Sequence, residues 1–209
     1  PEAPLRQAMH FLAQAQGDGR ISATTRYMAV ADYSQNSRNE RFYLLDLENL
    51  TVRREKVSHG GGGRTRGNPG DPNGDGMLDQ CGTSGSNMTR AGFFRVENLS
   101  YGAGHPRWTP FRTASGQRAN FAAMEGLTPG VNLTAMADGV MMHQADYNAG
   151  GSAHMGLTWG CPAFVPGRGG PVMEALARGS LFYSYAPMCR QQMSHVYDQV
   201  DGWEQFCRQ

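Results

Sequence analysis

The residues best suited to chemistry lie between positions 140 and 164. A strand-like run ends at His143, a variable loop follows, and Thr158-Trp159-Gly160-Cys161 comes next. A cysteine attacks a carbonyl carbon as the thiolate, so it needs a nearby imidazole to accept its proton. The developing oxyanion needs backbone N–H donors, and a glycine leaves that backbone open to substrate. The sequence therefore predicts Cys161 as a nucleophile, His143 as its general base and Gly160 at the oxyanion site.

These residues need a rigid scaffold, and the surrounding sequence predicts strands. Glycine (28 residues) and proline (11) are frequent and charged residues make up 18%, a balance typical of loop-rich β proteins. Apolar and aromatic runs predict a mainly β fold with a few peripheral helices. Strands are expected at 26–33, 41–47, 51–58, 91–101, 119–127, 139–143, 160–165 and 180–186, and helices at 4–16 and 171–178. The first three strands should form a meander. We expect one domain over 1–209, with its core at about 26–186 and a C-terminal tail at 187–209.

A long loop is predicted at 60–87, where apolar residues are scarce and Gly, Asn and Asp are frequent. Loops of this length are often functional lids, and segment 101–118 is a second lid candidate. The long loop contains the start of a calcium-loop pattern, with oxygen-bearing side chains at Asp71, Asn73, Asp75 and Asp79. Gly82 stands where a bidentate glutamate belongs. A plain Asx-rich turn is therefore favoured over a calcium site.

Composition excludes several classes of function. The net charge is +1 and the basic residues are scattered, so the sequence lacks the basic patch typical of nucleic-acid binding. No apolar run approaches the roughly 20 residues that cross a bilayer, and no signal-like segment opens the chain, so we expect a mature secreted form. The four cysteines lack the paired spacing of structural zinc sites, and we expect no cofactor.

The order of His143, a variable loop and Thr158-x-Gly160-Cys161 resembles the signature of L,D-transpeptidase (YkuD-like) catalytic domains. His143 stands eighteen positions before Cys161, within the spacing of that family. The continuation Gly160-Cys161-Pro162-Ala163 resembles the murein L,D-transpeptidase subfamily, and not the branch that has arginine or asparagine shortly after the cysteine. Papain-like and NlpC-type cysteine peptidases place the cysteine before the histidine, so chain order counts against them.

The resemblance extends over about residues 26–186. Its outer pieces are Ser58-His59-Gly60, Ser86-Asn87 followed by Gly92-Phe93-Phe94, and Met124-Glu125-Gly126-Leu127 with Asn132. It implies a β-sandwich-like catalytic domain with the cysteine at the base of a partly covered groove. We expect substrate-binding roles for His59, Thr158, Trp159, Tyr147, His154 and Asn87. His59 remains open between a pocket-lining donor and a strand-end histidine bonded to backbone.

The resemblance also implies an activity. Cys161 would form a thioester with a peptidoglycan stem peptide, and an amine of a second stem would resolve it into a crosslink. The implied partners are stem peptides as donor and acceptor, carbapenem β-lactams as inhibitors, and neither nucleic acid nor a transmembrane segment. The implied location is the periplasm or cell envelope.

Two alternatives stay open at this point. Water as acceptor would make the same Cys-His site an L,D-carboxypeptidase. A different class of protein, a metal-stabilised envelope-binding module, would hold zinc with His143, Asp146, His154 and Cys161.

The remaining cysteines should form a disulfide if the protein meets the oxidising envelope. Cys189 and Cys207 both lie beyond the last predicted core strand, in a tail whose Val196, Trp203 and Phe206 predict a short helical return onto the domain. We therefore expect them to pair. Cys81, in the long loop, could compete for either partner, while Cys161 should stay reduced.

Overall fold

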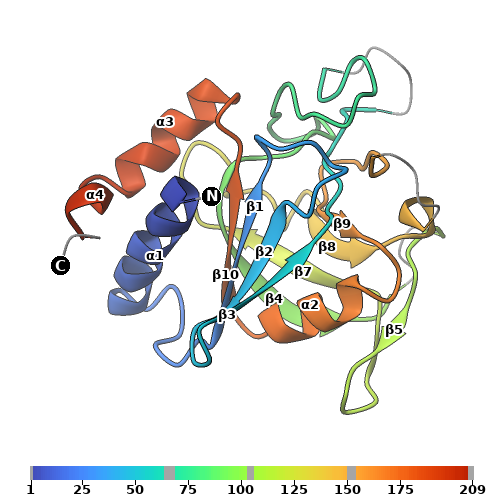
Figure 1. The fold of residues 1–209 in the computed structure, drawn as a ribbon, viewed down its shortest axis with the longest axis horizontal. Coiled ribbons are helices and arrows are strands. Elements are labelled where there is room, and N and C mark those ends of the chain that lie inside the picture. The colour runs from blue at the N-terminus through green and yellow to red at the C-terminus, as the bar shows by residue number, and fades with distance from the viewer. Residues whose placement is uncertain (1, 64–68, 103–105, 150–153, 207–209) are drawn as a thin grey trace.

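The computed structural model describes residues 2–63, 69–102, 106–149 and 154–206 (Figure 1). The elements in chain order are α1 (Glu2–Gly17), β1 (Tyr27–Asp32), β2 (Phe42–Asp46), β3 (Thr51–Glu55), β4 (Gly92–Ser100), β5 (Phe111–Arg112), β6 (Arg118–Ala119), β7 (Phe121–Gly126), β8 (Met141–Gln144), the 3-10 turn η1 (Asp146–Asn148), β9 (Ala163–Phe164), α2 (Gly169–Leu176), β10 (Ser180–Tyr185), α3 (Arg190–Gln199) and α4 (Trp203–Phe206). The mainly β class, the N-terminal helix and the few peripheral helices predicted from the sequence are confirmed.

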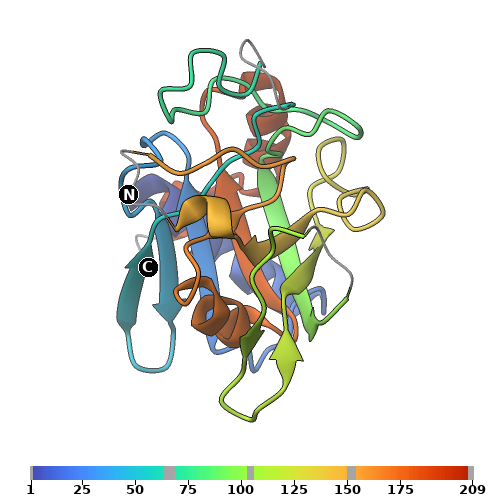
Figure 2. The same ribbon diagram turned by 90° about the vertical axis from the view of Figure 1, so that its right-hand side faces the viewer.

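Eight strands form one twisted sheet in the order β3-β2-β1-β10-β4-β7-β8-β9 (Figures 1 and 2). The expected meander is present, because β1, β2 and β3 pair as consecutive antiparallel neighbours. β10 returns to pair with β1 in parallel, and the edge strand β9 pairs with β8 in parallel. The pairing of β8 with β9 brings the strand that carries His143 beside the segment that follows Cys161. A short ribbon pairs β5, inside the second lid candidate, with β6 at its end, and of these residues only Ala119 was predicted to lie in a strand.

Helix α1 covers one face of the central strands. Its buried residues recur at helical spacing and include Ala8, Phe11 and Ala15. The ring of Phe11 stacks on Phe93 of β4 with their centroids 3.8 Å apart. The Tyr183 hydroxyl of β10 donates a hydrogen bond to Gln7 at 2.9 Å. This face therefore joins the N-terminal helix to strands from the middle and the end of the chain.

Helix α2 packs on the opposite face of the same strands. Phe94 follows Phe93 in β4, and Phe182 precedes Tyr183 in β10. Successive side chains of a strand alternate between faces, so Phe94 and Phe182 point away from α1. There Phe182 contacts Phe42 and Phe94, with centroids 5.7 Å apart in each pair. Phe42 also meets Phe164 of β9 edge to face at 4.9 Å. This second cluster fixes β9, and with it the approach to the cysteine, against the core.

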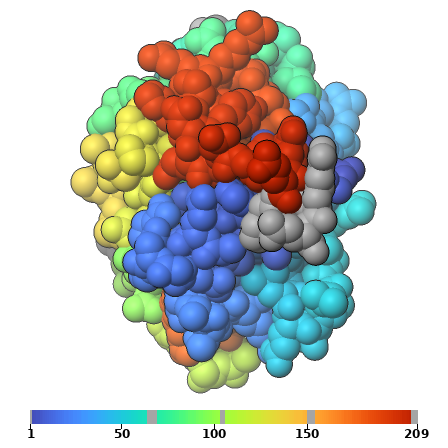
Figure 3. All heavy atoms as spheres, turned by 90° about the vertical axis from the view of Figure 1, so that its left-hand side faces the viewer, coloured from blue at the N-terminus to red at the C-terminus, as the bar shows by residue number. Residues whose placement is uncertain are grey.

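The C-terminal segment returns onto the domain as helices. In the space-filling view of Figure 3, α3 and α4 (red) lie beside α1 (blue). The side chains of Met193 and Val196 in α3 are buried. No helix in the described part of the chain is long and apolar enough to cross a membrane.

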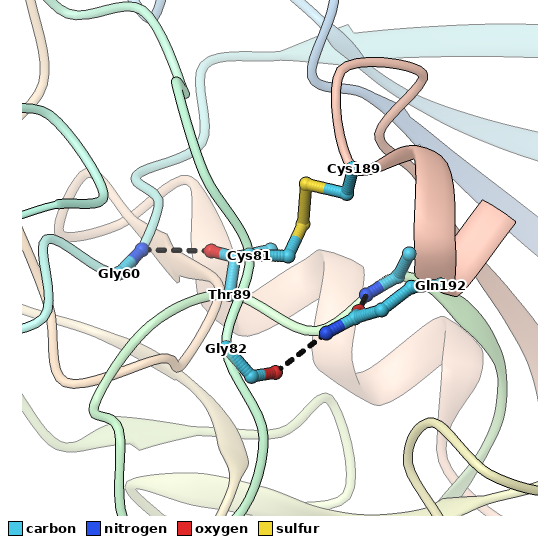
Figure 4. Close-up of a disulfide and its surroundings, with 7 residues drawn as sticks. Gly60, Cys81, Gly82, Thr89, Cys189 and Gln192 are labelled. Carbon is cyan, nitrogen blue, oxygen red and sulfur yellow. Dashed lines mark hydrogen bonds between the residues drawn. A yellow bond between two sulfur atoms is a disulfide. The ribbon is translucent and has the colours of Figure 1, made fainter.

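The disulfide predicted between Cys189 and Cys207 is wrong. Cys189, at the start of α3, is bonded to Cys81 in the long loop, 108 positions earlier (Figure 4). Gln192 of α3 secures the same junction, because it donates to the carbonyl of Gly82 at 2.8 Å and accepts the Ala91 N–H at 2.8 Å. Sequence proximity favoured the wrong partner, whereas the return of α3 onto the sheet brings Cys189 to the loop. Cys207 lies outside the described residues.

The disulfide should stabilise the fold strongly, because it closes a long span of chain. We expect Cys81→Ser with Cys189→Ser to lower the free energy of unfolding by about 2–5 kcal/mol. Urea unfolding of the oxidised wild type and the double variant measures this change. Reducing agent serves as the control, since it should destabilise the wild type and leave the double variant unchanged. Equal unfolding curves for the two oxidised proteins would contradict the prediction.

Candidate active site

A cavity of about 990 Å³ opens beside the β8–β9 edge of the sheet. Both lid candidates supply walls, residues 71–74 from the long loop and 106–108 from the second segment. Six of the predicted site residues line it: Cys161, His143, Thr158, Trp159, Tyr147 and Asn87. Among the described residues His59, His154 and Gly160 do not line the cavity, and each has a different place.

Cys161 enters the cavity from the turn that precedes β9. The side chain is buried and the thiol is free of any disulfide. The N–H of Met141 donates to its sulfur at 3.4 Å, and the sulfur lies 3.8 Å from the carbonyl oxygen of Gly139. Burial raises the pKa of the Cys161 thiol to about 11, although the Met141 N–H favours the thiolate. The resting group is therefore a thiol, which needs a base to become a nucleophile.

The turn around Cys161 is held by Thr158. Its hydroxyl donates to the carbonyl of Cys161 at 2.6 Å. The Thr158 N–H donates to the carbonyl of His59 at 2.9 Å, and its own carbonyl accepts the Gly61 N–H at 3.1 Å. Thr158 thus lines the cavity, but its side chain closes the turn that presents the cysteine.

His143 lies on β8 with its side chain 1% exposed. Its backbone N–H donates to the carbonyl of Pro162 at 3.3 Å, which aligns it with the residue after Cys161. The indole of Trp108 stacks on the imidazole, with centroids 4.4 Å apart and planes 21° apart. The ring of Tyr147 meets the imidazole edge to face at 6.5 Å. Nothing in the sequence pattern singled out Trp108, which is one of three aromatic residues in segment 101–118.

Glycines bring three backbone segments together beneath the cysteine. A β-carbon on Gly60 would lie 2.6 Å from Cα of Gly160 and 2.7 Å from the nitrogen of Thr89. Gly160 has a φ of 97°, and a β-carbon there would lie 2.9 Å from the carbonyl oxygen of Met88. The positive φ and the close packing explain a glycine at position 160, and its expected role at the oxyanion site stays a prediction.

His59 lies behind the cavity wall and is fully buried. Its Nδ1 is 2.8 Å from Nη2 of Arg41, and its Nε2 is 3.5 Å from the Asp71 carboxylate. A guanidinium can only donate, so Nδ1 must accept and the proton must lie on Nε2, facing Asp71. Burial lowers the pKa of His59 and keeps the ring neutral. His59 is thus a structural link between Arg41 and the loop.

Arg41 is a second residue that sequence reasoning missed. Its side chain is fully buried, and burial lowers the pKa of its guanidinium to about 10. It donates to the carbonyls of Val57 and Gln35, and its guanidinium lies 4.8 Å from the ring centroid of Tyr33. Only spatial contacts distinguish this arginine from the exposed arginines of the chain.

The calcium-like pattern forms a network of turns. The Asp71 carboxylate accepts the N–H groups of Asp75 and Gly76, the Asn73 side-chain oxygen accepts the Asp75 N–H, and Asp75 accepts the Met77 N–H. Burial, together with the nearby charges of Asp75 and Asp71, raises the pKa of Asp79.

No cluster of three or more His, Cys, Asp or Glu residues in the described part of the chain could hold a metal ion. The four residues of the zinc alternative are all described and do not form such a cluster. The side chain of His154 lies instead beside the long loop, 2.7 Å from where a β-carbon on Gly76 would be.

The comparison with protein families gives a match over nearly the whole chain. Residues 2–185 match the model of the L,D-transpeptidase catalytic domain, and the chain therefore belongs to this family. The comparison with curated proteins found no match.

Solved structures of low identity are also similar. An L,D-transpeptidase from Mycobacterium smegmatis is 13% identical with a TM-score of 0.42, over 77% of this chain and 59% of that chain. The L,D-transpeptidase LdtMt1 in complex with imipenem is 14% identical with a TM-score of 0.42, over 76% and 58%. One from Stackebrandtia nassauensis is 11% identical with a TM-score of 0.36, over 86% and 65%. The chain thus spans less than two thirds of the length of these proteins.

The close approach of Gly60 to Gly160 should be sensitive to a single added carbon. We expect Gly60→Ala to lower the free energy of unfolding by about 2 kcal/mol, because the β-carbon meets backbone that cannot rotate away. Gly17→Ala is the matched control, because a β-carbon there meets nothing within 4 Å. This change should not destabilise the fold, since it lowers the conformational entropy of the unfolded chain. Urea unfolding measures both, and equal effects would contradict the tight contact.

Proposed function

We propose that this chain is a peptidoglycan L,D-transpeptidase that acts through a Cys161 thioester. One observation carries the proposal: the Cys161 thiol and the His143 imidazole line the same cavity in a chain that belongs to the L,D-transpeptidase catalytic domain family. A thiol and an imidazole that line one cavity are the two groups that acyl transfer through cysteine needs.

The first half of the reaction forms the acyl-enzyme. His143 takes the proton of the Cys161 thiol, and the sulfur attacks the carbonyl between an L-centre and a terminal D-residue of a stem peptide. The C–S bond forms, the C–N bond breaks, and His143 returns the proton to the departing amine. The N–H groups of Gly160 and Cys161 are the proposed donors to the oxyanion.

The second half resolves the thioester. A side-chain amine on a second stem peptide loses a proton to His143 and attacks the thioester carbonyl. The new C–N bond is the crosslink, and the broken C–S bond returns the thiol. Water in place of the amine would release the stem peptide as a carboxylic acid.

The surroundings of the thiol explain why the base matters. A group with a pKa of about 11 is almost entirely protonated near neutral pH. The Met141 N–H can stabilise the thiolate once formed, and His143 supplies the proton acceptor. Trp159, 48% exposed, together with Tyr147 and Asn87, forms the proposed substrate-contacting wall.

The proposed location is the periplasm or cell envelope. Disulfides persist in oxidising compartments, and the Cys81–Cys189 bond fits such a setting. Peptidoglycan, the proposed substrate, lies in that compartment.

We expect Cys161→Ala to abolish both transfer and hydrolysis, and Cys161→Ser to leave at most a trace, because a serine hydroxyl is far less acidic than a thiol. Mass spectrometry of tetrapeptide muropeptides incubated with each protein measures crosslinked and hydrolysed products. Trp203→Phe, in α4 outside the cavity, is a control that should retain activity. Crosslinking by Cys161→Ala at the wild-type rate would sink the proposal.

Imipenem should acylate Cys161, because its strained lactam offers a carbonyl to the same thiol. A relative was solved in complex with this drug. Intact-protein mass spectra should gain one drug mass in the wild type and none in Cys161→Ala, with a penicillin reacting poorly. An adduct of equal yield in both proteins would place the drug on another residue and contradict the prediction.

A further inference from the structure

The imidazole of His143 has an aromatic neighbour that the reaction, as described, does not use. The indole of Trp108 covers one side of the ring, nearly parallel to it, at a centroid separation of 4.4 Å. Both residues line the cavity that contains Cys161. Rotation of the imidazole out of its plane would therefore collide with the indole.

Trp108 is itself fixed by β8. Its backbone forms an isolated bridge with Ala145, and the N–H of Thr109 donates to the carbonyl of Gln144 at 2.9 Å. On the other side of Trp108, the carbonyl of Arg107 accepts the N–H of Asp146 at 3.1 Å. These bonds hold the segment on the same strand that carries His143, so the indole and the imidazole keep a constant separation.

The indole also has a second contact that fixes its orientation. Its ring meets the ring of Phe121 edge to face, with centroids 5.8 Å apart. Phe121 is the residue of β7 that pairs with His143 across the sheet. The three rings therefore form one unit at the β7–β8 pair.

Stacking has an electrostatic consequence when His143 takes a proton. An imidazolium that is 1% exposed has lost most of its hydration, which disfavours the charge. The face of an indole carries partial negative charge and attracts a cation placed over it. Trp108 is positioned to offset part of the lost hydration in the charged state only.

Several other titratable and charged groups line the same cavity as the imidazole, among them Asp71, Arg107 and Asp138. Cys161 lies in the same cavity, and Tyr147 meets the ring from η1. Burial raises the pKa of Tyr147, so its hydroxyl stays neutral near neutral pH. The guanidinium of Arg107 lies over the Tyr147 ring and pairs with Asp146 at 2.7 Å.

We propose that Trp108 is a positioning residue that fixes the plane of the His143 imidazole and stabilises its protonated form. This inference rests on the proposed role of His143 as general base. Because Trp108 acts through another residue, its loss should lower kcat and leave KM for the stem peptide unchanged. It should also change the titration of His143 in the absence of substrate.

Two non-aromatic variants and one aromatic variant test the role. Trp108→Leu removes the ring face and should lower kcat about tenfold. Trp108→Met is a second non-aromatic change, with a flexible chain that fills irregular space if leucine packs badly. Trp108→Phe keeps a ring face and should restore kcat to within about threefold of the wild type. Trp203→Leu is the matched control outside the cavity.

Nuclear magnetic resonance of histidine-labelled protein gives a readout independent of activity. The His143 signal, assigned by its loss in His143→Gln, should titrate at lower pH in both non-aromatic variants and lose the upfield displacement caused by the indole. The signal in Trp108→Phe should lie nearer the wild type. Unchanged titration and kcat in a folded non-aromatic variant would overturn the inference. Full transfer by His143→Gln would overturn the proposed function instead. The titration of His143 in the wild type and the Trp108 variants would still report on the stack.

Discussion

The backbone of Gly60 lies against that of Gly160 with no space for a β-carbon between them. Side chains can rotate or shift to relieve a contact, but backbone held in paired segments cannot. The carbonyl of Met88 closes a third side of the same contact. The position of Cys161 is therefore set by backbone packing, and the strand pairing that aligns His143 depends on that position. The sheet, the long loop and the cavity all meet at this point.

Two buried polar side chains, Arg41 and Cys161, differ in their charge state. Arg41 keeps a charge in the interior because backbone carbonyls, the ring of Tyr33 and a neutral His59 satisfy it. Cys161 is kept neutral by the same burial, which disfavours the thiolate. Burial therefore has different outcomes for the two groups, since the Arg41 guanidinium has partners that stabilise its charge and the Cys161 thiol has few. The two histidines differ in the same way, because His59 contacts buried charged groups whereas His143 lines the cavity.

Local patterns in the sequence predicted much of this protein, and distant contacts account for what they missed. Apolar runs located nearly every strand, since alternation and turn residues are local properties. Cys161 and His143 were predicted by chain order and spacing. Trp108 and Arg41 showed no such local pattern. Trp108 stacks on His143, and Arg41 is buried against His59, and both contacts join segments far apart in the chain. The pairing of Cys189 was wrong for the same reason, as nearness in sequence was a poor guide to nearness in the fold.

The bond between Cys81 and Cys189 has a consequence for how the chain reaches its native state. Cys161 lies between the two in sequence, so each alternative pairing with it would close a shorter segment of chain than the native bond. Shorter segments meet more often in an unfolded chain. To reach the native disulfide, the folding chain must therefore bury Cys161 early or exchange mispaired disulfides afterwards. A mispaired molecule would lose the free Cys161 thiol as well as its native disulfide. The yield of reactive thiol per molecule would then report on the fidelity of folding.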